Sequence, residues 1–253
     1  MITVPLPVLA LGLAPVNTIH PTAVIGPQVE LGSGNTVGPH AVLQGPLTIG
    51  DDNWIGPSVV LGTPPEVRGF DHGDWEHPGH GAGLAIGDRN VLREFSTVHS
   101  GWRAPTRVGD DCFVMNKVYI GHDGRIGSGA TMAAGVNLGG HVTVGEGANL
   151  GLGSQVHQRR VIGPGAMVGM GSIVTHDVLP FAKSYGNPAR LVAANVFRLR
   201  TLGWSEDAIS QLDDRYRRMA QGLVPTGDLD GLPGAFDPAL VWWNEASAAA
   251  SGN

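Results

Sequence analysis

The sequence is poor in cysteine, in charged residues and in long apolar runs. Its single cysteine, Cys112, excludes a disulfide framework and favours a reducing compartment. Only 15% of the 253 residues are charged, and the net charge is −6. An acidic chain without a stripe of basic and aromatic residues is not expected to bind nucleic acid. No segment reaches the roughly 20 apolar residues that span a bilayer, so we expect no stable membrane insertion and a cytoplasmic location.

The first sixteen residues also lack lysine and arginine, although they are mostly apolar. A secretory signal begins with a positively charged region, so this stretch does not match one. We expect residues 1–18 to form an apolar segment that packs on the first coil of the fold.

What the sequence does contain is an apolar residue at every sixth position. A period of six fits neither a helix nor a two-faced strand, but it is typical of a short strand, a turn and a repeat. Many of these residues precede a glycine, which tolerates a tight turn. The residues with this period are Ile19, Ile25, Leu31, Val37, Leu43, Ile49, Ile55 and Leu61, then Ile86, Leu92 and Val98, then Val108, Val114, Ile120, Ile126, Met132, Leu138, Val144, Leu150, Val156, Ile162, Val168 and Val174.

Three hexads make one triangular coil, so residues eighteen apart are expected to be stacked neighbours. Each coil would place its inward Val, Ile or Leu on the coil below, which builds a core that no single coil could bury. A sandwich or barrel of short strands would instead show turn signals every 8 to 12 residues or so, about once per strand and without strict phase. We therefore predict an all-β solenoid, a parallel β-helix of hexapeptide repeats, over residues 19–180.

Two interruptions break the repeat, at residues 62–85 and 99–107. Both segments are expected to project as loops, and inserted loops of a repeat protein often carry function. The period then stops. From Arg190 the apolar spacing predicts helices, and Ser205 with the two acids that follow it is typical of a helix N-cap. We expect residues 181–253 to be a small, mainly helical C-terminal region.

Several segments are more specific than the hexads. They are IHPTAVIG (19–26), IGDRNVLRE (86–94), IGHDGRIG (120–127), LGGHVTVGEGANLGLGSQVHQ (138–158), YGNPARL (185–191) and GWSEDAI (203–209). In this order they resemble the UDP-N-acetylglucosamine O-acyltransferases of lipid A biosynthesis. The resemblance implies a left-handed β-helix, an exception to the usual right-handed crossover, in a homotrimer. It also implies transfer of a 3-hydroxyacyl chain from acyl carrier protein to a hydroxyl of a UDP-linked amino sugar, the first step of lipid A assembly.

His122 is the candidate general base. A neutral imidazole beside the carboxylate of Asp123 could remove a proton from a sugar hydroxyl, and the resemblance gives His122 this role. By resemblance, the backbone N–H of Gly140 would stabilise the thioester oxyanion, because a glycine lets the backbone approach a developing charge. The residues expected to act in catalysis are therefore His122, Asp123 and Gly140.

Two further histidines are expected to share this cleft. His141 lies nineteen residues after His122, hence one coil further on and displaced by one position, and His157 follows sixteen residues later. This spacing keeps the three histidines within a narrow strip. The resemblance implies that His141, His157 and Gln158 contact the nucleotide sugar or the arm of the acyl carrier.

The chain departs from the family pattern in two places. Family members carry an acid and a lysine in the loop after the early coils, where this chain has Glu66 and Arg68. They usually carry consecutive arginines before a helical Gly-Phe, where this chain has Arg200 followed by Thr and Leu. Only Arg200 and Asn195 then remain near a diphosphate. All four residues are expected to bind substrate, and the nucleotide or the sugar could differ from UDP-N-acetylglucosamine.

No cofactor and no metal are expected. The γ-class carbonic anhydrases use the same solenoid with three histidine ligands to zinc, and two of these come from one short segment. The matching stretch here, residues 118–123, supplies only His122, which disfavours this alternative. Three histidines of the first inserted loop could bind a metal, but scattered histidines in a Gly- and Pro-rich loop are more often solvated. They are His72, His77 and His80.

The acyl donor is open to more than one reading. Residues 181–220 hold seven basic against four acidic residues, a net charge of +3, which would steer an acidic acyl carrier protein to this region. A solvated helix surface with ordinary ion pairs would have the same composition. The alternatives are a related sugar acyltransferase that uses acetyl-CoA, and a catalytically silent solenoid that binds a sugar nucleotide. His122 with Gly140 favours an enzyme.

Met170 is predicted to limit the length of the acyl chain. By resemblance, the acyl chain lies in a groove between adjacent subunits. Met170 follows His122 by forty-eight residues, which places the two positions roughly 13 Å apart along the axis if coils stack at about 4.8 Å. We therefore expect a donor of about ten carbons to be preferred over one of about fourteen. Alternatively, Met170 only fills a gap between subunits.

Overall fold

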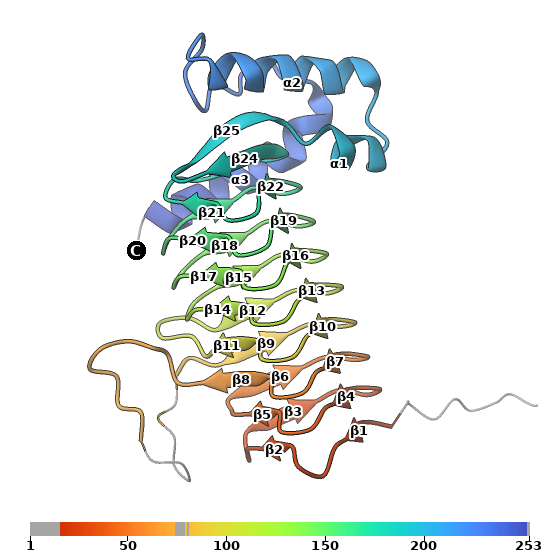
Figure 1. Cartoon of the computed structure of the whole chain (residues 1–253), viewed down its shortest axis with the longest axis vertical. Helices are drawn as coiled ribbons and strands as arrows, with labels where there is room; N and C mark the ends of the chain where they lie inside the picture. Colours follow the sequence, from red (N-terminus) through yellow and green to blue (C-terminus); the bar gives the residue numbers. More distant parts are fainter. Residues whose placement is uncertain (1–15, 74–78, 80, 252–253) are drawn as a thin grey trace, which may run out of the picture.

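The chain forms a prism of stacked coils with a helical region at one end (Figure 1). The computed structural model describes residues 16–73, 79 and 81–251. The packing predicted for residues 1–18 falls largely outside the described residues, and so do His77 and His80 of the first inserted loop.

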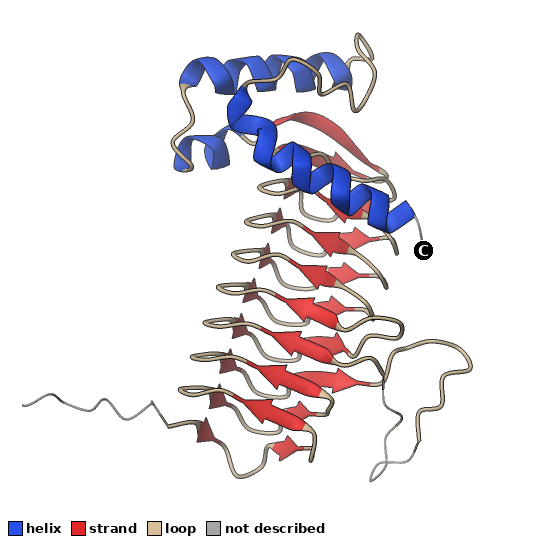
Figure 2. Ribbon diagram, turned by 180° about the vertical axis from the view of Figure 1, so that it is seen from behind, coloured by secondary structure: helices blue, strands red, loops and turns tan. Residues whose placement is uncertain are grey.

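Short strands form three parallel sheets, one for each face of the prism (Figure 2). The first sheet consists of β1 (Thr18–Ile19), β4 (Thr36–Val37), β7 (Trp54–Ile55), β10 (Val91–Leu92), β13 (Phe113–Val114), β16 (Thr131–Met132), β19 (Asn149–Leu150), β22 (Met167–Val168), β24 (Ala182–Gly186) and β25 (Ala189–Ala194). The second sheet consists of β2 (Val24–Ile25), β5 (Val42–Leu43), β8 (Val60–Thr63), β11 (Thr97–His99), β14 (Tyr119–Ile120), β17 (Asn137–Leu138), β20 (Gln155–Val156) and β23 (Ile173–Val174). The third sheet consists of β3 (Val29–Leu31), β6 (Leu47–Ile49), β9 (Leu84–Ile86), β12 (Thr106–Val108), β15 (Arg125–Ile126), β18 (Thr143–Val144) and β21 (Val161–Ile162).

Residues eighteen apart pair with one another wherever the repeat is uninterrupted, as the hexads predict. Ile120 pairs with Leu138, and Leu138 pairs with Val156. These three side chains are at most 4% exposed and belong to one continuous core. Truncating such a residue to alanine typically costs about 2 to 5 kcal/mol, so the aligned aliphatic side chains hold the coils together. The predicted left-handed parallel β-helix is confirmed.

A ladder of buried asparagines supports the early coils beside the apolar core. The Asn35 carboxamide oxygen accepts the backbone N–H of Asn53, and the Asn53 carboxamide oxygen accepts that of Asn90. The Asn90 oxygen in turn accepts the N–H of Cys112. Burial raises the pKa of the Cys112 thiol to about 11, so this cysteine is protonated at neutral pH and belongs to the core.

Both inserted loops leave the same edge of the prism. The first connects β8 to β9 across residues 64–83, and the second connects β11 to β12 across residues 100–105. At this edge every coil passes from its strand in the second sheet to its strand in the third sheet. The repeat is therefore interrupted only at this edge within the described residues, and the other two corners keep their turns unchanged.

The C-terminal region begins with a hairpin, so the predicted start of the helices at Arg190 was wrong, although helices do follow from Val196. Strand β24 extends the first sheet beside β22, and β25 pairs with β24 in the antiparallel sense. Arg190 lies within β25. A helix starts only after Asn195, whose side chain accepts the N–H of Arg198. Pairing between strands, rather than local apolar spacing, decided the conformation of this stretch.

In the described part of the chain, three α-helices cover the end and one face of the prism. They are α1 (Val196–Thr201), α2 (Glu206–Ala220) and α3 (Asp237–Ser251), with the short 3-10 helix η1 (Gly234–Phe236) before α3. As predicted, Ser205 caps α2 by accepting the N–H of Ala208. Helix α2 packs on β25 through an apolar face, and α3 runs across the outer side of the third sheet (Figure 2). None of the described helices is both long enough and apolar enough to cross a membrane.

Candidate active site

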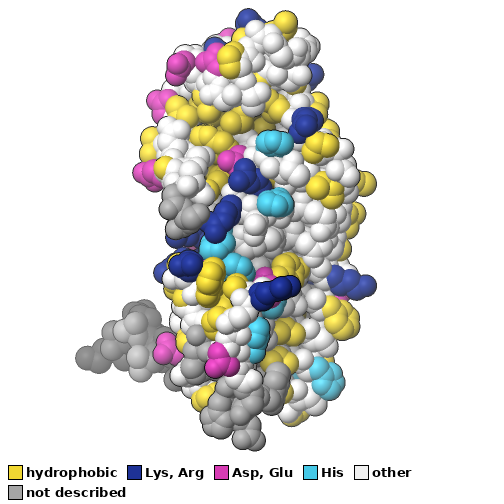
Figure 3. All heavy atoms as spheres, turned by 90° about the vertical axis from the view of Figure 1, so that its left-hand side faces the viewer, with side chains coloured by type: hydrophobic (Ala, Val, Ile, Leu, Met, Phe, Trp, Pro, Cys, Tyr) yellow, Lys and Arg dark blue, Asp and Glu magenta, His cyan; other side chains and the backbone are white. Residues whose placement is uncertain are grey.

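The candidate catalytic residues lie in stacked turns between the second and third sheets. We call this edge the histidine corner, and its turns are residues 121–124, 139–142 and 157–160. Asp123, His141 and Arg159 hold the same position in successive turns, and each has a left-handed backbone with φ of 58°, 61° and 61°. Because the turns repeat, side chains from successive coils project next to one another. Figure 3 shows histidines in a column along this face, with Lys and Arg side chains beside them.

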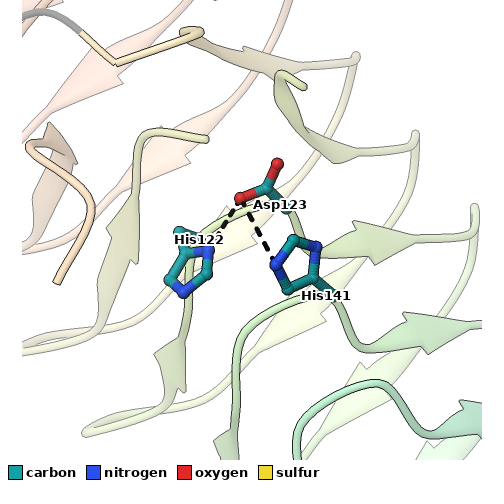
Figure 4. A group of neighbouring side chains, drawn as sticks. All are labelled: His122, Asp123 and His141. Carbon is teal, nitrogen blue, oxygen red and sulfur yellow. Dashed lines mark hydrogen bonds and ion pairs between the residues drawn. The ribbon is translucent and has the colours of Figure 1, made fainter. Parts of the chain in front are cut away.

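His122 and Asp123 form a largely buried pair. The His122 Nδ1 lies 2.7 Å from Asp123 Oδ2, and the two side chains are 13% and 4% exposed (Figure 4). The Asp123 carboxylate also accepts the backbone N–H groups of Trp102, Arg103 and Ala104, which belong to the second inserted loop. This loop therefore closes around Asp123.

The hydrogen bonds to Asp123 decide its protonation state. Burial on its own would raise the pKa of Asp123, but the hydrogen bonds from His122 and from three backbone N–H groups outweigh burial and lower it. An ionised carboxylate only accepts hydrogen bonds, so Nδ1 of His122 must carry the proton. With the proton on Nδ1, the imidazole presents Nε2 as its free acceptor, which is the atom that a general base needs.

Gly140 lies directly against the His122 ring. A Cβ atom at position 140 would lie 2.5 Å from His122 Nε2, which is too close for any side chain. Within the part of the chain that the structure describes, the Gly140 N–H has no hydrogen-bond acceptor. A free N–H beside a proton acceptor is what an oxyanion site requires. The glycine therefore leaves room for the imidazole and keeps the N–H accessible.

His141 completes the cluster from the next coil. Its ring meets the His122 ring edge to face at 4.9 Å, and its Nε2 lies 4.0 Å from Asp123 Oδ2. Burial lowers the pKa of His141, and the positive charges of Arg159 and Arg103 lower it further, against the opposing charge of Asp123. His141 is therefore neutral at neutral pH, and it can donate or accept a hydrogen bond without adding charge.

The same three side chains meet a minimal geometric condition for a metal site. One ligand atom from each of His122, Asp123 and His141 lies within 4.8 Å of the other two. The Asp123 oxygens, however, already accept hydrogen bonds from His122 and three N–H groups, which gives this carboxylate an orienting role in the cluster. That no metal is needed remains a prediction.

Glu66 reaches the cluster from the first inserted loop. It accepts a hydrogen bond from the Tyr119 hydroxyl, and its Oε2 lies 3.3 Å from Nδ1 of His99. A Cβ atom on Gly121 would lie 3.0 Å from Glu66 Oε1, so the carboxylate borders the catalytic turn. Burial, together with the hydrogen bond and the charge of Glu66, raises the pKa of Tyr119, which therefore stays protonated. Arg68 is exposed in the same loop.

His99 and Tyr119 also border the site, although neither was predicted from the sequence as its neighbour. His99 ends β11, and the Tyr119 ring packs edge-on against it at 5.3 Å. A signal for both was present. Tyr119 stands three residues before His122, and His99 immediately precedes the second inserted loop, so both occupy the strands that lead into the histidine corner.

The remaining predicted residues of this corner are exposed. His157 and Gln158 occupy the next turn, where Nδ1 of His157 lies 3.1 Å from the Gln158 carbonyl oxygen. The structure therefore aligns His122, His141 and His157 along one edge, as their spacing predicts.

Three predicted site residues lie elsewhere in the chain. Asn195 is buried, donates to the Gly165 carbonyl oxygen at 2.9 Å and caps α1, so its polar atoms serve the fold. Arg200 forms a bidentate pair with Glu206 at 2.7 and 2.8 Å on the helical region. Met170 is 76% exposed at the corner between the first and second sheets. Within one subunit, none of the three belongs to the histidine corner.

Curated proteins are similar in sequence to about half of the chain. No family model matches the chain. Over 137 residues the chain is 39% identical to the acyl-[acyl-carrier-protein]–UDP-N-acetylglucosamine O-acyltransferase of Burkholderia thailandensis and 40% identical to that of Burkholderia mallei. This stretch is 53% of the chain, and it spans about half, 52%, of the length of each of these relatives.

Solved structures extend the similarity to nearly the whole chain. The UDP-N-acetylglucosamine O-acyltransferase (LpxA) of Moraxella catarrhalis is 30% identical, with a TM-score of 0.64 over 92% of this chain and 93% of that one. The LpxA structure from Acinetobacter baumannii is 26% identical, with a TM-score of 0.66 over 93% of this chain and 95% of that one. By fold and by sequence, the chain belongs to the UDP-N-acetylglucosamine O-acyltransferase family.

Proposed function

We propose that the protein transfers a 3-hydroxyacyl chain from acyl carrier protein to a hydroxyl of UDP-N-acetylglucosamine or a closely similar UDP-amino sugar, as the first step of lipid A assembly. One observation carries the proposal. The free Nε2 of His122, held by an ionised Asp123, lies against Gly140, whose N–H is free among the described residues. The names of the relatives supply the substrates.

The chemistry follows from these two groups. His122 Nε2 removes the proton of the sugar hydroxyl while the hydroxyl oxygen attacks the thioester carbonyl carbon. The carbonyl oxygen becomes an oxyanion, which the Gly140 N–H stabilises. When the carbon–sulfur bond breaks, the leaving thiolate takes the proton from His122. The products are the sugar ester and the free carrier thiol, and Asp123 stays ionised throughout.

The basic helical region gives less support to a carrier donor than its sequence suggests. Four of its seven basic residues form ion pairs with acids, namely Arg200 with Glu206, Arg215 with Asp228, Arg217 with Asp213 and Arg218 with Asp214. Three of these acids are already counted in the net charge of +3, and only the pair with Asp228 lowers it further. The small net positive charge that remains would attract the phosphates of coenzyme A as well as an acidic carrier. The choice of acyl carrier protein over coenzyme A therefore rests on the names of the relatives.

A homotrimer is part of the proposal. Large apolar side chains are exposed along the corner between the first and second sheets, which we call the apolar corner; they include Phe95, Leu152 and Met170. A cyclic trimer needs two different complementary patches on each subunit. The apolar corner and the histidine corner flank the second sheet, so one subunit's apolar corner can meet its neighbour's histidine corner. Met170 would then line a groove that begins at the neighbour's His122.

The proposal is tested by incubating the protein with a panel of UDP-sugars and one donor at a time, namely 3-hydroxyacyl-acyl carrier protein, 3-hydroxyacyl-CoA or acetyl-CoA, and by following transfer by mass. We expect transfer from the carrier thioester to a UDP-amino sugar, and transfer at least about a hundredfold slower by the His122→Ala variant. Transfer from acetyl-CoA alone would show that the donor is acetyl-CoA and not an acyl carrier thioester. Binding of a sugar nucleotide without any transfer would indicate a catalytically silent solenoid. No cofactor is added, and the cytoplasmic location stays a prediction.

A further inference from the structure

The second inserted loop presents an arginine at the entrance to the catalytic cluster. Its backbone is fixed, because Trp102, Arg103 and Ala104 all donate their N–H groups to Asp123 at 2.7 to 2.9 Å. A Cβ atom on Gly101 would lie 1.7 Å from the Ala104 carbonyl oxygen, so only glycine permits this tight path. The loop and the catalytic carboxylate thus hold each other in place.

The side chains of this loop stack in order above His122. The Trp102 ring meets the His122 ring edge to face at 6.2 Å, and the Arg103 guanidinium lies over the Trp102 ring at 4.2 Å from its centre. Stacking on an indole restrains a guanidinium without using its N–H groups, which remain directed outward from its edge. The loop therefore presents a positioned and exposed cation beside the general base.

Arg103 has no acidic partner among the residues that the structure describes, whereas many other arginines do. Arg89, Arg93 and Arg160 each lie within 4.0 Å of a carboxylate oxygen, and so do the four arginines of the helical region described above. Among the described residues, no aspartate or glutamate side chain forms an ion pair with Arg103. A positive charge left without a counterion next to a substrate cleft attracts an anionic group of the substrate.

We propose that Trp102 and Arg103 form a phosphate-binding lip on the histidine corner, with Arg103 contacting a phosphate group of a substrate. This inference rests on the proposed function, in which both substrates carry phosphate. One is the diphosphate of the UDP-sugar, and the other is the phosphate of the carrier's phosphopantetheine arm. A guanidinium edge fits either of them through paired N–H···O hydrogen bonds. Arg159 on the neighbouring turn adds positive charge near His141.

The test measures binding without turnover. Isothermal titration calorimetry of the intact protein with UDP and, separately, with 4′-phosphopantetheine identifies which phosphate the lip holds. We expect Arg103→Ala to weaken one of the two by at least about tenfold, since hydrogen bonds to a charged group are strong. Arg103→Lys should restore part of the affinity, and Trp102→Phe should cause a smaller loss. Arg89→Ala, which removes an exposed arginine paired with Asp111, is the matched control and should leave both affinities unchanged.

Salt dependence separates a phosphate contact from a structural role. In the wild type, affinity for the held phosphate should fall as ionic strength rises, and Arg103→Ala should flatten this dependence. The lip is wrong if neither ligand binds the wild type, or if both bind the Arg103→Ala variant with wild-type affinity and salt dependence. Arg103-dependent binding by a protein without transferase activity would sustain the lip and refute the proposed function, so the two can fail separately.

Discussion

The histidine corner and the apolar corner are built from the same backbone turn and differ in almost everything else. Both repeat every eighteen residues, and both contain residues with a left-handed backbone, such as Asp123 at one and Phe95 at the other. At the histidine corner the side chains are polar and partly buried, and two inserted loops cover them. At the apolar corner, large side chains face outward without any insertion. The coil supplies only regular spacing, so the chemistry depends on which side chains and insertions each corner carries.

The largest difference between the corners should appear on removal of the general base. His122→Ala is expected to reduce the rate of acyl transfer by about 10² to 10⁴, the usual contribution of proton transfer. The core should remain intact, because the side chain lies outside the apolar stack. His176 holds the same turn position three coils further on and is exposed, so His176→Ala is the matched control. Single-turnover kinetics with a carrier thioester measure the rates of both variants. A near-normal rate for His122→Ala would show that His122 is not the general base.

A smaller but still large effect is expected at Gly140. The methyl group of Gly140→Ala would lie 2.5 Å from His122 Nε2. It must push the imidazole away from its position beside the Gly140 N–H. We expect a loss of about 10² in rate, near the lower range for losing an oxyanion donor, with the fold retained. Gly26→Ala at the first coil of the same corner is the control, since its nearest contact would be 3.4 Å. Equal activity of the two variants would contradict the close packing of Gly140 on His122.

The apolar corner is tested by chain length. Met170→Gly should raise activity with a fourteen-carbon donor several-fold relative to a ten-carbon donor, because it removes the exposed side chain that we propose as the end of the acyl groove. Leu152→Gly alters the same turn position one coil earlier and serves as the comparison. The ratio of kcat/KM for the two donors is the readout. An unchanged ratio in Met170→Gly would leave Met170 as a residue that only fills space between subunits.

The smallest predicted effect concerns the pH dependence of stability. The folded protein lowers the pKa of His141, mainly by burial, so the unfolded chain binds this proton more readily. The free energy of unfolding should therefore rise with pH from the lowered pKa up to about 6.5 and then level off. His141→Asn should flatten the curve in this window, whereas exposed His176→Asn should not. Denaturant unfolding from pH 5 to pH 8 or so, about the range in which histidine titrates, would reveal it.

Periodicity predicted the fold because each buried aliphatic repeats the same local rule. The spacing of His122, His141 and His157 likewise predicted their shared edge. The three N–H groups that hold Asp123 could not be predicted, because the hexad stops at the inserted loop and periodicity carries no information about its path. Hairpin β24–β25 was missed because its conformation depends on pairing between strands.

The eighteen-residue repeat also predicts the corner at which Met170 lies. Forty-eight residues amount to two coils and twelve residues, so Met170 must lie two faces away from His122. The axial distance between the two residues does not by itself show this change of corner. Within one subunit the two residues occupy different edges, and only a neighbouring subunit can bring them to one groove.

Complementation between subunits tests this central claim most directly. His122→Ala subunits lack the base, and Met170→Trp subunits should block the groove, so each variant alone is expected to be nearly inactive toward a ten-carbon donor. The two variants are then co-expressed so that they mix at random in cyclic trimers. A site that combines His122 of one subunit with Met170 of its neighbour is intact in about one quarter of cases. We predict recovery of about that fraction of wild-type activity. A purified mixed oligomer with no recovered activity would contradict a site shared between the histidine corner and the apolar corner.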